Sequence, residues 1–126
     1  MDRLFIRLGA LAGFIGVGLG AFGAHALRAR LSTGDLAVFE TGVRYQLVHA
    51  LALVLVGLLG IYQPRQRPTR LANAAGWCFT LGIVLFSGSL YVLAMTDITA
   101  IGIVTPFGGL CFLAGWACLG LAASRA

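Results

Sequence analysis

A short segment, "ETGVRYQLVH" from Glu40 to His49, carries the side chains of this chain that are best suited to chemistry. Arg44 could hold an anion, and Glu40 and His49 could act together as an acid/base couple. Glu40 and Arg44 stand four residues apart, which places them on one face of a helix, and Tyr45 and His49 have the same spacing. Glu40 and His49 are nine residues apart, about 180° around a straight helix. The segment therefore has two polar faces, and only a bend near Gly42, or partners on both sides, would gather the four groups.

Each of these groups has a structural and a functional interpretation. Glu40 and Arg44 either form a salt bridge that neutralises two charges at the membrane edge or contribute to a ligand site. His25 and His49 either bond to carbonyl groups or to Glu40, or clamp a haem or another metal from neighbouring helices. No second histidine pair and no carboxylate–histidine pattern accompanies them, so we expect no metal site and no cofactor.

Further polar side chains stand in "FSGSLY" and beside Pro106. If successive helices cross the membrane in alternating directions, these groups share the outer half of the bundle with His25 and the Glu40–His49 segment. Serine and glycine are also common where membrane helices pack, so a purely structural role is an equal alternative. The resulting polar cluster comprises His25, Glu40, Arg44, Tyr45, Gln46, His49, Ser87, Ser89, Tyr91 and Thr105.

The elements that position this cluster are membrane helices. The chain has 126 residues, 60% of them hydrophobic, and a mean hydropathy of +0.95, which is far too apolar for a soluble domain. Four windows without acidic or basic charge, each at least 20 residues long, are each long enough to cross a hydrocarbon layer of ~30 Å. The windows are 8–27, 45–64, 71–96 and 98–124.

We therefore predict one all-α integral membrane domain over residues 1–126, a bundle of four transmembrane helices near 4–27, 34–62, 71–95 and 98–123. A straight helix over 34–62 would be about 43 Å long, so its part before Tyr45 is expected to lie at or beyond the membrane surface as a short interfacial segment. Ser32 or Thr33 can cap this helix. The first apolar run is too long for a signal-peptide core, so we expect it to be a retained membrane helix.

All nine basic residues are arginines. With both termini in the cytoplasm, six arginines lie on that side and three on the other, which favours this orientation in a bacterial inner membrane. The basic excess then reflects membrane orientation and contact with lipid headgroups, and no nucleic-acid partner is expected.

Five glycines form a stripe along one face of the first helix, because they are spaced by 4, 3, 4 and 3 residues. Such a stripe lets another backbone come close and predicts a packing seam, with either a helix of this chain, a second copy or another membrane protein. The stripe comprises Gly9, Gly13, Gly16, Gly20 and Gly23.

The chain contains no G-x-S-x-G, no H-E-x-x-H, no phosphate-binding glycine loop and no acid pair within a span. We therefore expect a non-enzymatic protein, most simply a structural or interaction protein. The alternative is a binder or conduit for a small molecule, ion or lipid through the polar cluster.

Four motifs, "GAFGAHAL", "FETGVRYQLVHALAL", "LFSGSLY" and "TPFGGLCFLAGW", together resemble the small membrane proteins grouped as domain of unknown function 423, which includes transmembrane protein 256. The resemblance covers nearly the whole chain and implies a short polytopic membrane protein, without implying an activity. The family pattern maps onto Gly20, Gly23, His25, Glu40, Thr41, Arg44, Tyr45, Gln46, His49, Ser87, Gly88, Ser89, Tyr91, Thr105, Pro106, Gly108 and Gly109.

Overall fold

The computed structural model describes residues 1–62 and 69–124. Within them, four helical segments are long and apolar enough to cross a membrane, which confirms the all-α membrane fold. Most of the "QPRQRPTR" connection, which we expected to form a cytoplasmic turn, lies outside the described residues.

The first two spans form an antiparallel pair. Helix α1 runs over Asp2–His25 and is followed by the 3₁₀ turn η1, Leu27–Ala29. Helix α2 runs over Thr33–Tyr62 and is capped as predicted, because the Asp35 amide donates to the Ser32 hydroxyl oxygen at 3.1 Å. The expected interfacial segment is thus the beginning of α2 and not a separate element.

Helix α2 continues through Gly42 as an unbroken α-helix. The glycine serves close packing instead, since a Cβ atom at this position would lie 2.8 Å from Cε1 of Tyr91. Because α2 stays helical, the two polar faces of the Glu40–His49 segment remain on opposite sides of it.

The third and fourth spans are each built in pieces. The third consists of α3 (Thr69–Gly82), a π-helical segment η2 (Ile83–Ser87) and α4 (Gly88–Met95). The fourth begins with the 3₁₀ segment η3 (Thr99–Ile103) and continues as α5 (Val104–Ser124). Pro106 lies in the first turn of α5, one of the two positions expected for it, where its missing N–H costs no helical hydrogen bond.

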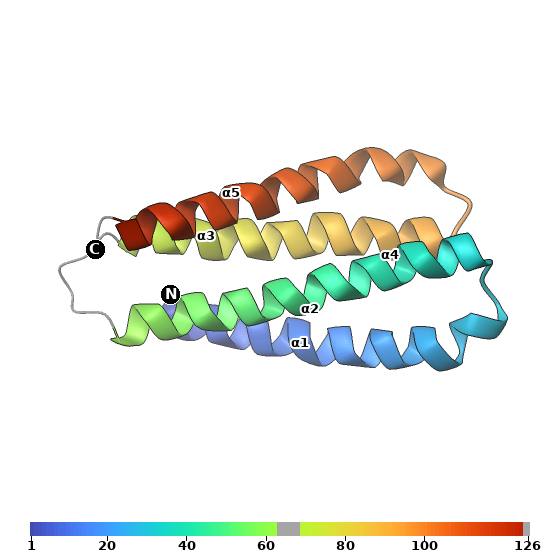
Figure 1. The fold of residues 1–126 in the computed structure, drawn as a ribbon, viewed down its shortest axis with the longest axis horizontal. Coiled ribbons are helices and arrows are strands. Elements are labelled where there is room, and N and C mark those ends of the chain that lie inside the picture. Colours follow the sequence, from blue (N-terminus) through green and yellow to red (C-terminus); the bar gives the residue numbers. More distant parts are fainter. Residues whose placement is uncertain (63–68, 125–126) are drawn as a thin grey trace.

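The helices lie side by side in the order α1, α2, α3–α4, α5 (Figure 1). The most extensive contacts join α1 to α2 and α3 to α5, while α2 also packs on α3, η2 and α4. Consequently α2 and the third span form the centre of the bundle, and α1 and α5 lie on its two flanks.

Two apolar clusters fill the bundle, one toward each end of α2. One cluster of buried side chains comprises Phe5, Ala52, Leu53, Val56, Ala75, Phe79 and Phe112. The other, near the η1 connection, comprises Leu27, Phe39, Val43 and Ala94. The positions of α2 between Val43 and Ala52 therefore lie between the two clusters.

The glycine stripe of α1 packs against α2 of the same chain. A Cβ atom at Gly9 would lie 2.7 Å from the carbonyl oxygen of Ala50, and one at Gly23 would lie 2.9 Å from Cε1 of Phe39. In this structure the stripe therefore packs on α2 of the same chain. Contact of the same face with a second copy or another membrane protein stays a prediction.

Candidate functional site

A network of hydrogen bonds centred on Gln46 ties three helices together. The side chain of Gln46 is only 4% exposed. Its Nε2 donates to the carbonyl oxygen of Ala12 in α1 at 2.9 Å, and its Oε1 accepts from the Tyr91 hydroxyl of α4 at 2.6 Å. The amide thus joins α1, α2 and α4 through both of its polar atoms.

Two serines of "FSGSLY" connect the third span to helices on opposite sides. Ser87, fully buried, donates to the carbonyl oxygen of Gly42 in α2 at 2.7 Å. Ser89 donates to the carbonyl oxygen of Phe86 at 2.9 Å, so its 2.6 Å contact with Thr105 of α5 is a bond that the Thr105 hydroxyl donates. Ser87 is the last residue of the π-helical segment, and Ser89 lies in the first turn of α4.

His49 has both ring nitrogens occupied. Its Nδ1 lies 2.7 Å from the carbonyl oxygen of Tyr45, which can only accept, so Nδ1 carries the proton. Nε2 then accepts from the indole N–H of Trp116 in α5 at 3.0 Å. The ring also stacks on Phe112, with centroids 3.6 Å apart and planes 10° from parallel. His49 is therefore a neutral, fully partnered histidine joining α2 to α5.

The network lies near the middle of helix α2. The midpoint of α2 falls between residues 47 and 48, directly between Gln46 and His49. Phe112, which stacks on His49, lies near the middle of the fourth helical segment, Thr99–Ser124. The placement of these groups in the outer half of the bundle stays a prediction.

The histidines do not share a depth, contrary to expectation. Gly23 of α1 packs against Phe39, so His25, two residues further on, lies near the start of α2. Ten residues of helix, about 15 Å, separate the level of Phe39 from His49. The two histidines therefore cannot clamp one haem or metal ion in this structure. Within the described residues no group of three or more potential metal ligands occurs.

The polar cluster thus divides into a buried and an exposed part. Gln46, His49, Ser87 and Ser89 are buried, and Tyr91 and Thr105 complete their hydrogen bonds. His25, Glu40 and Arg44 are exposed, and no ion pair joins Glu40 to Arg44 in the part of the chain that the structure describes. Tyr45 belongs to neither part: it is 42% exposed and packs on Phe86, with ring centroids 4.7 Å apart.

Sequence reasoning missed Trp116 and the carbonyl group of Ala12. Trp116 could have been found, because an indole N–H inside an apolar span needs an acceptor. The role of the Ala12 carbonyl could not have been found, because every residue of a helix has a carbonyl group. Only the packing of α1 on α2 determines which of them accepts from Gln46.

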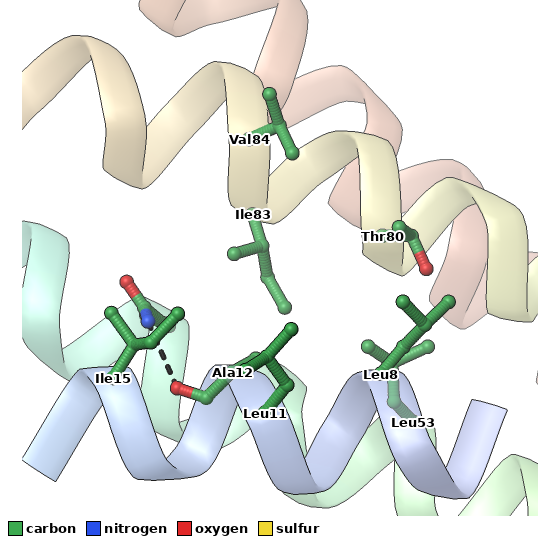
Figure 2. A pocket seen from close by; sticks show the side chains of 9 residues that line it. Leu8, Leu11, Ala12, Ile15, Leu53, Thr80, Ile83 and Val84 are labelled. Atoms are coloured by element: carbon green, nitrogen blue, oxygen red, sulfur yellow. Dashed lines mark hydrogen bonds between the residues drawn. The ribbon is translucent and has the colours of Figure 1, made fainter. Parts of the chain in front are cut away.

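Two grooves open on the sides of the bundle next to this network. A groove of about 540 Å³ between α2 and α5 is lined by Tyr45, His49, Phe86, Pro106, Gly109, Leu110, Phe112, Leu113 and Trp116. A smaller apolar cavity of about 160 Å³ lies between α1 and the third span, where Leu8, Leu11 and Ile15 face Thr80, Ile83 and Val84 (Figure 2). Gln46 also lines this cavity, next to its bond with Ala12.

Known proteins share this sequence over most of its length. The model of a family described as protein of unknown function (DUF423) matches residues 19–109. A UPF0382 membrane protein of Staphylococcus haemolyticus is 47% identical over 114 residues, which cover 90% of this chain and 89% of that protein. The UPF0382 membrane protein YwdK of Bacillus subtilis is 43% identical over 123 residues, which cover 98% of each chain. No solved structure matches. The chain therefore belongs to the DUF423 family of membrane proteins, as its four motifs indicated.

Proposed function

We propose that this chain is a non-enzymatic interaction protein of the membrane whose buried polar network is structural. The supporting observation is that, among the described residues, every buried side-chain nitrogen and oxygen has a hydrogen-bond partner. Side chains whose polar atoms are all engaged within the fold stabilise and align helices, and they have no free atom to offer a substrate.

The bond between Trp116 and His49 offers a direct test. If His49 is structural, Trp116→Phe leaves its Nε2 unpaired and lowers the free energy of unfolding in detergent by about 1 kcal/mol. A double-mutant cycle with His49→Phe should give a coupling free energy of similar size. If the two single effects simply add, the bond contributes nothing and the structural assignment of His49 fails.

A second candidate function is the binding of a flat apolar molecule from the bilayer in the groove between α2 and α5. Its walls are mainly aromatic, and the hydroxyl of Tyr45 has no hydrogen-bond partner within the described residues. A planar ligand carrying one acceptor group would fit these walls and could accept from that hydroxyl. The apolar clusters at both ends of the bundle favour binding at this side groove over conduction along the bundle axis.

This candidate is tested with the quinone menadione as the probe. In Trp77→Phe, Trp116 is the remaining tryptophan and should show saturable fluorescence quenching by menadione. In the matched control Trp116→Phe, Trp77 of α3 should show only the linear quenching of random collisions. Linear quenching in both variants would exclude a quinone site in this groove.

We also infer a bacterial inner-membrane location with both termini in the cytoplasm. The support is the distribution of arginines, together with the four spans, which place the start of α1 and the end of α5 at the same end of the bundle (Figure 1).

A further inference from the structure

A shallow groove runs along one side of the α1–α2 pair and is lined only by residues of these two helices. One part, of about 310 Å³, lies between Glu40 and Leu47 on α2 and beside Gly20 and Gly23 on α1. The other, of about 430 Å³, continues from Leu47 to Val54. Both parts share Leu47, and we call them together the α1–α2 groove.

The groove is charged at one end and apolar along the rest. On α2 the groove is lined by Phe39, Glu40, Val43, Arg44, Leu47, Ala50, Leu51 and Val54. Five of them, from Glu40 through Arg44, Leu47 and Leu51 to Val54, are spaced by 4, 3, 4 and 3 residues and form one stripe. On α1, a Cβ atom at Gly13 would find its nearest neighbour 3.9 Å away, so the floor has room there. A ligand that fits must therefore have a polar head and an apolar tail.

The two charges specify the head. Glu40 and Arg44 are exposed and are not paired with each other in the described chain. The guanidinium of an arginine matches a phosphate with two parallel hydrogen bonds. Glu40 lies one turn, about 6 Å, nearer to the start of α2 and hence to water, where a cationic group beyond the phosphate would meet its carboxylate.

The length of the apolar part fits one lipid leaflet. From Arg44 to Val54 the groove follows ten residues of helix, about 15 Å. This is half of a hydrocarbon layer of ~30 Å, the depth that one acyl chain spans beneath its headgroup.

We propose that the α1–α2 groove binds one phospholipid with an ammonium-bearing headgroup, such as phosphatidylethanolamine. Arg44 binds the phosphate, Glu40 binds the ammonium, and one acyl chain lies along Leu47, Leu51 and Val54. This site is separate from the aromatic groove between α2 and α5, so each of the two binding proposals can be disproved without affecting the other.

Native mass spectrometry of the full chain, offered phosphatidylethanolamine or phosphatidylglycerol at equal concentration, tests the headgroup. The wild type should retain more phosphatidylethanolamine. Arg44→Gln should reduce retention of that lipid about tenfold, as expected for losing a hydrogen bond between charged groups, while Arg30→Gln should not. Glu40→Gln should remove the preference between the two lipids.

Two further variants test the tail and the order of the charges. Leu51 is 68% exposed, and Leu51→Trp fills the groove and should displace the lipid. Leu121 on α5 is 52% exposed and lies outside the groove, so Leu121→Trp should not displace it. The exchange Glu40→Arg with Arg44→Glu keeps the net charge but reverses the order, and should also abolish the preference. Circular dichroism confirms that each variant is folded, which is expected at exposed positions.

Three results would overturn the proposal. The first is equal retention of both lipids by the wild type, and the second is an Arg44→Gln variant that retains as much lipid as Arg30→Gln. The third is a dimer peak that disappears in Leu51→Trp, which would identify a second copy of the chain as the occupant of the groove.

Discussion

Gln46 connects three helices because a primary amide both donates and accepts. Its neighbours on α2 are mostly apolar, and its partners are the carbonyl of Ala12 and the hydroxyl of Tyr91. In the hydrocarbon layer an amide without partners is costly, so these two bonds select one packing of α1, α2 and α4 among several that apolar contacts alone would allow.

Tyr91→Phe should lower the free energy of unfolding by about 1 kcal/mol, because it leaves Oε1 of Gln46 without its donor. The measurement is chemical unfolding in detergent micelles followed by circular dichroism. Tyr62→Phe is the control, since Tyr62 is 81% exposed at the end of α2 and should behave like the wild type. Equal stability of the two variants would show that the Tyr91 bond is energetically neutral.

The residue types of the network could be predicted from the sequence, but their partners could not. Gln46, His49, Ser87 and Ser89 stand out as polar groups in apolar windows. Glu40 and Arg44 lie outside these windows, but nothing in the sequence separates the four groups from His25, because helical spacing leaves open which face of a helix meets which neighbour. The 3.6-residue period thus gives candidates, and packing decides between burial and exposure.

At the scale of elements, the glycine stripe of α1 could be predicted from the sequence, whereas the π-helical segment of the third span could not. The stripe is periodic, so its role as a packing seam could be predicted, although its partner could not. The π-helical segment over Ile83–Ser87 has no periodic signal, because it depends on the hydrogen bonds that the third span makes with α2 and α5.

Two glycine-to-alanine substitutions on α1, one inside the packing seam and one outside it, test how the seam contributes to stability. Gly9→Ala should destabilise the protein by about 1–3 kcal/mol, because the added methyl would meet the backbone carbonyl of Ala50. Gly18→Ala, on the same helix, meets no atom within 4 Å and should be neutral or stabilise the helix by up to about 1 kcal/mol.

Thermal unfolding of both variants in the same detergent checks this contrast. If Gly9→Ala proved as stable as Gly18→Ala, α1 would have to shift along α2 at little cost, and the seam would not fix their packing.

At the scale of the whole molecule, the orientation that we propose rests on the even number of spans in the described chain and on the arginine distribution. A fluorescent protein that folds only in the cytoplasm, fused after Ala126, should be bright, and alkaline phosphatase fused at the same place should be inactive. Adding arginines beside Arg28 and Arg30 should invert part of the population, so that the fluorescent fusion dims and the phosphatase fusion gains activity. The reason is that the excess of arginines then lies on the side of Arg28 and Arg30. A dark fluorescent fusion together with an active phosphatase fusion would show that the orientation is the opposite of the one proposed.

The number of spans and the fold class could be predicted because the hydrocarbon thickness fixes the length of an apolar window. The order in which the helices pack could not, since short loops allow several arrangements of four helices. The placement of α1 and α5 on the flanks follows from contacts between side chains far apart in the chain, such as His49 with Trp116.

That same contact bears on how the protein is made. The acceptor on His49 and the donor on Trp116 are separated by 67 residues of chain. At a synthesis rate of ~5–20 residues per second, α2 waits roughly 3 to 13 seconds in or near the membrane before its partner emerges. During that interval Nε2 of His49 lacks the donor that it has in the finished bundle. The newly made second helix therefore needs shelter by the insertion machinery until α5 arrives.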